Sequence, residues 1–214
     1  MYLDNFEIFF WDFDGVIKDS VSVKTDAFEE IFKPYGKKIS SKIRDHHIEN
    51  GGMSRFEKIP LYLKWANIEV NSNNIEEKCS QFSEIIKNKV INSKWVPGVI
   101  EFLENTKSKN SIIVSATPQN ELEDICISLD LNKYFSSIYG SPISKFKAIK
   151  KSIDIHRVNP DKCLMFGDAR TDIEAAKDNN IKFIFRRHDH NKFLDISSDI
   201  QVINDFTNIN NLFK

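Results

Sequence analysis

Two aspartates, Asp12 and Asp14, end a run of apolar residues near the start of the chain and are separated only by Phe13. In an extended chain, residues i and i+2 point the same way, so both carboxylates would face one site. Unpaired buried carboxylates are costly, so a positive group is expected to meet them. Mg²⁺, an oxygen-binding cation, would offset their repulsion. A solvated strand end is the alternative interpretation of this pair taken alone.

The segment GDARTD, residues 167–172, also follows an apolar run and opens a helical pattern. Asp168 is therefore expected at the same edge of a sheet as the first two aspartates, where it would complete a Mg²⁺ site. Gly167 would permit close backbone approach, and Asp172 falls in the first turn of the helix. Helix capping is the alternative explanation for these carboxylates.

A third apolar run ends in Ser115, Ala116 and Thr117. The Ser115 hydroxyl could donate to a phosphoryl oxygen beside the Ala116 amide, although a polar strand end explains Ser115 equally well. Thr117 has the position of a helix N-cap, since Pro118 follows it.

Lys145 opens another helical pattern, where its charge opposes the helix dipole. Neutralising a nucleophilic carboxylate and a transferring phosphoryl group would account for a lysine at this place. A solvated lysine is the alternative, because Lys147, Lys150 and Lys151 lie close by.

The segments that position these residues alternate between strand and helix. Unbroken apolar runs predict strands at 6–13, 111–116, 162–168, 181–186 and, more briefly, 200–205. Amphipathic patterns predict helices at 119–131, at 144–153 and after GDARTD. Such alternation implies right-handed βαβ crossovers and an α/β fold with a doubly wound parallel sheet.

Residues 18–92 interrupt this alternation with amphipathic helical patterns and no clear strand. We interpret 18–92 as an α-helical subdomain inserted after the first strand, which leaves 1–17 and 93–214 to form the core.

The amino-acid composition narrows the classes of partner that this protein is expected to bind. The 30 basic residues nearly cancel the 31 acidic ones, and no apolar run approaches the length of a membrane span, so neither nucleic acid nor a membrane is an expected partner. The cysteines are odd in number and widely spaced, at Cys79, Cys126 and Cys163. Free thiols in a reducing compartment, and hence the cytoplasm, are the expectation.

Taken in order, DFDGV at 12–16, Ser115 after its strand, Lys145 and GDARTD at 167–172 resemble the four motifs of the haloacid dehalogenase superfamily. The resemblance spans essentially the whole chain and implies a Rossmann-like core. The insert looks like the helical C1 cap of the phosphoglycolate phosphatase and β-phosphoglucomutase branch.

The resemblance implies a role for each matched residue. Asp12 would be the nucleophile that attacks phosphorus, and Asp14 would protonate the leaving oxygen and then activate water against the aspartyl-phosphate. Asp12, Asp168 and the backbone carbonyl of Asp14 would hold Mg²⁺. The phosphoryl oxygens would be held by Ser115 and Lys145, with Ala116 and Thr117 beside them, and Asp172 would orient Lys145 or a metal-bound water.

The cap would select the substrate. In ENGGMSRFEK, residues 49–58, two glycines precede Ser54, Arg55 and Lys58, similar to the cap loop with which β-phosphoglucomutases hold a distal phosphate. We expect a flexible loop with a cationic tip, or alternatively an exposed basic helix start. Lys24 is either a substrate contact or a solvated helix lysine. His46–His47 are interpreted as cap surface or loop packing. Arg186–Arg187–His188 follow another strand and could border the site, but we interpret them as charged loop residues.

The resulting hypothesis is a Mg²⁺-dependent phosphatase of a small phosphorylated metabolite, a sugar phosphate or a phosphorylated acid, acting as a monomer or homodimer. Asp14 argues against the dehalogenase and phosphonate-cleaving branches, which lack it. A phosphoglycolate phosphatase and a β-phosphoglucomutase-like phosphomutase are alternatives; mutases usually have an acidic residue where Gly167 stands. A non-catalytic ligand-binding protein on the same scaffold is the alternative from another class.

Overall fold

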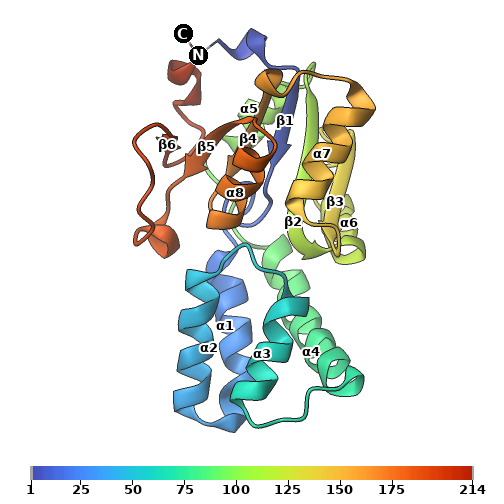
Figure 1. The fold of residues 1–214 in the computed structure, drawn as a ribbon, viewed down its shortest axis with the longest axis vertical. Helices are drawn as coiled ribbons and strands as arrows, with labels where there is room; N and C mark the ends of the chain where they lie inside the picture. Colours follow the sequence, from blue (N-terminus) through green and yellow to red (C-terminus); the bar gives the residue numbers. More distant parts are fainter. Residues whose placement is uncertain (1, 214) are drawn as a thin grey trace.

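The computed structural model describes residues 2–213, which form a sheet-containing core and a bundle of helices below it (Figure 1). Its six strands are β1 (Ile8–Trp11), β2 (Asn110–Pro118), β3 (Ser137–Ser141), β4 (Cys163–Gly167), β5 (Lys182–Arg186) and β6 (Gln201–Ile203). All neighbours are parallel, in the order β3-β2-β1-β4-β5-β6. After β3, at one edge of the sheet, the chain crosses over to β4, which lies on the other side of β1. This arrangement confirms the predicted α/β fold with a doubly wound parallel sheet.

Helices cover both faces of the sheet. They are α5 (Val99–Asn105), α6 (Gln119–Ser128), α7 (Lys145–His156) and α8 (Arg170–Asp178). Alternate residues of β1 point to opposite faces, so Phe9 and Trp11 join the cluster that includes α5 and α6. Ile8 and Phe10 join the cluster formed with α7 and α8. Burial on both faces explains the unbroken apolar sequence of this central strand.

The strand β3 was absent from the sequence-based expectation. It lies at the edge of the sheet, and three of its five residues, Ser137 to Tyr139, are only half-buried. Its sequence, SIYGS, therefore lacks the apolar run by which a central strand is recognised. The N-cap expected at Thr117 is also wrong, because β2 extends to Pro118 and α6 begins only after it.

The four helices of the lower bundle are α1 (Val21–Phe32), α2 (Lys37–Glu49), α3 (Arg55–Trp65) and α4 (Ser72–Ile91) (Figure 1). They all lie within the segment 18–92 that the sequence predicts as a cap, and we use that name for them. Their apolar faces meet around Phe28, whose ring packs against Tyr62 and Phe82. These rings form the apolar interior of the cap, and they belong to the same cluster of buried residues as Phe9 and Trp11 of the core.

Two chain segments join the cap to the core, and they are hydrogen-bonded to each other. The Asp19 amide donates to the Lys94 carbonyl at 2.8 Å, and the Val96 amide donates to the Ile17 carbonyl at 3.0 Å. Lys18 is buried between them, with its Nζ 4.1 Å from the centre of the Trp95 ring.

Within residues 2–213, no helix combines the length and apolar character that a membrane span requires. The three cysteines are all free thiols.

Candidate active site

The first strand delivers Asp12 to a pocket at the carboxyl end of the sheet. Its carboxylate accepts a hydrogen bond from the Phe13 amide at 2.7 Å and lies 2.8 Å from Lys145 Nζ. Only 5% of Asp12 is exposed. Burial raises the pKa of Asp12 to about 6, although the charge of Lys145 acts in the opposite direction. A buried carboxylate beside a lysine is suited to act as a nucleophile.

Asp14 lines the same pocket and has three side-chain donors around it. Ser20 donates to its Oδ1 at 2.5 Å, Thr117 donates to its Oδ2 at 3.1 Å, and Lys24 of α1 forms an ion pair with Oδ2. Burial alone would raise the pKa of Asp14, but the charge and hydrogen bond of Lys24 outweigh it and lower that pKa. Lys24 is thus a half-buried ion-pair partner of the core and not a solvated helix lysine.

The strand β4 delivers Asp168 to the same edge of the sheet, and Asp172 follows in the first turn of α8. One carboxylate oxygen of Asp172 accepts from the amides of Asp168 and Ala169, at 3.1 and 3.0 Å. Its other oxygen lies 2.5 Å from Lys145 Nζ. Asp172 therefore shapes the turn after β4 and orients Lys145, which stands between it and Asp12.

Glycines make room for this packing. Gly15 has a φ of +78°, and a Cβ there would lie 2.3 Å from Asp168 Oδ2. At Gly167, as expected for close backbone approach, a Cβ would lie 2.4 Å from the Cβ of Asp172.

The phosphate-binding residues expected after β2 also line the pocket: Ser115, Ala116 and Thr117. The Ser115 hydroxyl accepts a hydrogen bond from the Thr117 amide at 3.1 Å, which fixes its oxygen at the strand end. Its hydroxyl proton remains available for an incoming acceptor. Thr117 bonds Asp14 and Lys24 through its side chain, so it links the core to the cap.

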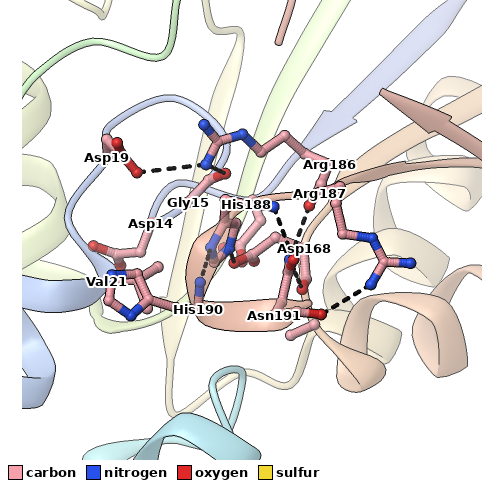
Figure 2. Close-up of polar contacts among 12 residues, drawn as sticks. Asp14, Gly15, Asp19, Val21, Asp168, Arg186, Arg187, His188, His190 and Asn191 are labelled. Carbon is pink, nitrogen blue, oxygen red and sulfur yellow. Dashed lines mark hydrogen bonds and ion pairs between the residues drawn. The ribbon is translucent and has the colours of Figure 1, made fainter. Parts of the chain in front are cut away.

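The segment after β5, interpreted from sequence as an ordinary charged loop, is part of the site (Figure 2). His188 Nε2 lies 2.7 Å from Asp168 Oδ2, and His188 Nδ1 accepts from the His190 amide at 3.2 Å. An amide can only donate, so the proton of a neutral His188 ring is on Nε2 and is directed at Asp168. Asn191 donates to the Asp168 and Arg186 carbonyls, both at 2.9 Å, and holds this loop in place.

Arg186 fixes the turn that follows Asp14 (Figure 2). Its guanidinium donates to the Gly15 carbonyl at 3.3 Å, and the same nitrogen lies 3.4 Å from an Asp19 carboxylate oxygen. The end of β5 and the end of β1 are thereby joined, and both candidate catalytic aspartates, Asp12 and Asp14, are held by neighbouring elements.

On the cap side, the residues expected at an exposed or flexible tip are buried. Arg55 is 5% exposed and binds Glu121 of α6 through two hydrogen bonds, at 2.6 and 2.9 Å. Lys58 is 1% exposed, and its Nζ lies 2.9 Å from His47 Nδ1. Arg55 and His47 line the pocket, whereas their partners Glu121 and Lys58 do not. His47, interpreted from sequence as surface or packing, therefore faces the site, while Lys58 stands behind it.

The charges in the pocket fit a divalent cation. Oxygens of Asp12, Asp168 and Asp172 all lie within 4.8 Å of one another. With Asp14, these four carboxylates have two lysines as ion-pair partners, Lys24 and Lys145, and His188 contacts Asp168. Carboxylate oxygens are the ligands that Mg²⁺ prefers, and its charge would balance the excess. Asp172 accepts from three donors, which are Lys145 and the amides of Asp168 and Ala169, whereas two donors contact Asp12 and one contacts Asp168, so Asp12 and Asp168 are the better candidates to hold a metal.

Comparison with known proteins assigns the chain to a family. Residues 9–185 match the model of the haloacid dehalogenase-like hydrolases, so the chain belongs to this family, as its motifs predicted. The expectation of an enzyme of this class is thereby confirmed.

A curated relative is similar over most of both chains. It is a phosphorylated carbohydrates phosphatase from Thermotoga maritima, 30% identical over 191 residues, which cover 84% of each protein.

Solved structures share the fold at lower identity. A predicted phosphoglycolate phosphatase from Haemophilus somnus 129PT superposes with a TM-score of 0.79 at 18% identity, over 99% of this chain and 100% of the other. CbbY from Rhodobacter sphaeroides, solved with xylulose-(1,5)bisphosphate, gives a TM-score of 0.76 at 13% identity, over 94% and 95% of the two chains.

Proposed function

We propose that this hydrolase is a Mg²⁺-dependent phosphatase that removes a phosphoryl group from a small phosphorylated carbohydrate through an aspartyl-phosphate intermediate. The observation that supports this most directly is the geometry around Asp12. Its buried carboxylate is 2.8 Å from Lys145 Nζ, and Asp14, Ser115 and Asp168 line the same pocket.

In the first step, an Asp12 oxygen attacks phosphorus and the bond to the leaving oxygen breaks. Lys145 and the Ser115 hydroxyl bind the phosphoryl oxygens, where they stabilise the charge that develops in the transition state. Asp14 delivers a proton to the leaving alkoxide. Mg²⁺, held by Asp12, Asp168 and the Asp14 carbonyl, would supply further charge neutralisation at the transferring group.

In the second step, water attacks phosphorus, the bond between phosphorus and the Asp12 oxygen breaks, and phosphate leaves. Asp14 takes a proton from the attacking water and so regains the proton that it gave to the leaving oxygen in the first step. Lys24, Ser20 and Thr117 hold the Asp14 carboxylate at the edge of the pocket, where it can reach that water. Asp172 keeps Lys145 in position throughout, since its own carboxylate is fixed by two backbone amides.

A carbohydrate phosphate is favoured as substrate for two reasons. The curated relative from Thermotoga maritima is a phosphatase of phosphorylated carbohydrates. In addition, the cap places apolar and polar side chains over the phosphate site, among them Phe28, His47 and Phe82. Such a covered pocket suits a small molecule.

The test is phosphate release from a panel of sugar phosphates, phosphoglycolate and β-glucose 1-phosphate with Mg²⁺, with product analysis for isomerisation. We expect turnover of at least one sugar phosphate, lost in EDTA and reduced at least about a thousandfold by Asp12→Asn. Asp154→Asn, an exposed change on α7, is the matched control and should behave like the wild type. Absence of turnover by folded, Mg²⁺-loaded protein would refute the proposal, and an isomerised product would indicate a mutase.

A further inference from the structure

The strongest ion pair between cap and core involves Arg55 at the start of α3 and Glu121 in the first turn of α6. The two side chains meet in a fork-to-fork arrangement, with nitrogen–oxygen distances of 2.6 and 2.9 Å. Ser83 of α4 completes it, because its hydroxyl accepts from Arg55 at 2.6 Å and donates to Glu121 at 2.8 Å. The Phe82 ring covers the guanidinium at 4.4 Å.

This pair is almost fully removed from solvent. The Arg55 side chain is 4% exposed and that of Glu121 is 9% exposed. Charge-assisted bidentate hydrogen bonds of this kind are among the strongest that side chains form, and they are not weakened by salt as surface pairs are. Arg55 nevertheless lines the substrate pocket.

An unpaired arginine in this place would attract a second phosphate on the substrate, since its planar fork matches a phosphate group. Here Glu121 already occupies that fork. A distal phosphate would have to break both hydrogen bonds and would leave the Glu121 carboxylate buried beside another anion, which is strongly unfavourable. The pair therefore acts against bisphosphates.

The cap offers a different contact to the leaving group. His47 Nδ1 is hydrogen-bonded to Lys58 Nζ, whereas His47 Nε2 has no hydrogen-bond partner within residues 2–213. His47 Nε2 is not fully enclosed, because the Thr171 hydroxyl is the one fully enclosed polar side-chain atom in that range that lacks a partner. His47 also lines the pocket. Burial and the nearby Lys58 hold the pKa of His47 well below its usual value, so its ring is neutral. A neutral imidazole is suited to a sugar hydroxyl.

We propose that Glu121 is a specificity-determining residue which, by holding the Arg55 guanidinium, directs this enzyme to monophosphorylated carbohydrates with an uncharged leaving group and excludes bisphosphates. The proposal rests on the proposed phosphatase function and concerns the same pocket. It adds a repulsive element, which is a common way for a site to discriminate between similar ligands.

The experiment measures hydrolysis of p-nitrophenyl phosphate in Mg²⁺, with fructose 6-phosphate and fructose 1,6-bisphosphate as competitors. The two inhibition constants can then be compared whether or not either sugar is itself hydrolysed. In the wild type, we expect the bisphosphate to bind no more tightly than the monophosphate, despite its additional charge. This ratio tests the proposal without any substitution.

Glu121→Gln should then release Arg55 to the distal phosphate. A charge-assisted hydrogen bond corresponds to about a tenfold to hundredfold gain in affinity, which we expect for the bisphosphate alone. The monophosphate constant should change less than about threefold, within the effect of a rearranged neutral contact. In the double variant Glu121→Gln/Arg55→Gln, the gain should disappear. The matched control is Asp124→Asn, which lies on α6 like Glu121. This change removes an exposed ion pair between the core and Lys87 of the cap, and it should leave both inhibition constants unchanged.

Two results would overturn the proposal. One is a wild-type enzyme that already binds the bisphosphate tenfold more tightly than the monophosphate. The other is a Glu121→Gln variant in which both constants change together, which would make the pair a simple closure contact. Failure of the wild type to hydrolyse p-nitrophenyl phosphate, by contrast, counts against the phosphatase function itself.

Discussion

The core and the cap differ in how their charged residues are paired. In the core, acidic side chains gather at the ends of β1 and β4, and Lys145 from α7 neutralises part of their charge. In the cap, the charged side chains that form ion pairs with the core at the site are basic. Lys24 and Arg55 find their carboxylate partners, Asp14 and Glu121, only across the boundary.

This difference shows that the two parts are electrostatically complementary, and that closing the cap satisfies charges on both sides. Lys58 is the exception among these cap residues, because its hydrogen-bond partner is the neutral ring of His47. The comparison can be tested at three places: the loop after β5 in the core, the interior of the cap and the boundary between them.

The largest effect is expected in the core. His188→Ala removes the hydrogen-bond donor that orients Asp168, and the loss of such a support typically weakens metal binding about tenfold to a hundredfold. His188→Gln, which can still donate, should recover part of the loss. Calorimetric titration with Mg²⁺ measures both.

His190→Ala is the control for this experiment, since His190 supports His188 through its backbone amide, which the substitution retains. Equal Mg²⁺ affinity in His188→Ala and the wild type would mean that Asp168 is positioned without the loop.

A smaller effect is expected inside the cap. Burial lowers the pKa of Lys58 to about 7 from its ordinary 10.5, so between these values the folded state binds fewer protons than the unfolded state. The free energy of unfolding should therefore rise with pH above 7, by about 2 kcal/mol between pH 7 and 9. Below pH 7, Lys58 is protonated in both states and its contribution is constant.

Lys58→Met should remove this rise, whereas Lys64→Met, an exposed change on the same helix, should retain it. Urea unfolding at pH 7 and 9 gives the comparison. A wild-type slope that Lys58→Met leaves intact would assign the pH dependence to other groups.

The smallest effect is expected at the boundary, where two adjacent glycines differ in the space available for a side chain. A Cβ at Gly52 would lie 1.7 Å from the Thr171 hydroxyl and 3.0 Å from the Thr171 Cβ, but one at Gly51 would meet only the Ala169 Cβ at 4.0 Å. Gly52→Ala should hinder closure and reduce kcat/KM about tenfold, a barrier increase of about 1.4 kcal/mol. Gly51→Ala should not. Steady-state kinetics on the best panel substrate decide this, and equal values for the two variants would show that the cap closes without this contact.

The sequence predicted the core better than the cap for a physical reason. A parallel strand buried on both faces must be apolar, and its carboxyl end must be polar if it lines a site, so Asp12, Asp168 and their strands are visible as local patterns. The edge strand β3 has no such constraint and was missed.

The partners of the cap residues are not local. Arg55 and Glu121 are 66 positions apart, and Lys24 and Thr117 are 93 apart. Nothing in the sequence around Arg55 indicates that its charge is already matched, so an exposed tip was the natural expectation. His188 was visible as a polar residue after a strand, but its contact with Asp168 depends on the shape of the loop that Asn191 maintains.

The paired segments that connect cap and core have a consequence for how substitutions combine. Because residues 17–19 and 94–96 are hydrogen-bonded to each other, bending of one segment would carry the other with it, and movement of the cap would be restricted to essentially one angle. A motion with one angle is described by one equilibrium constant between open and closed forms. A change at Gly52 that hinders closure would shift that constant, whereas Glu121→Gln acts on the distal phosphate of the substrate, so the free-energy effects of the two changes should add in a double-mutant cycle.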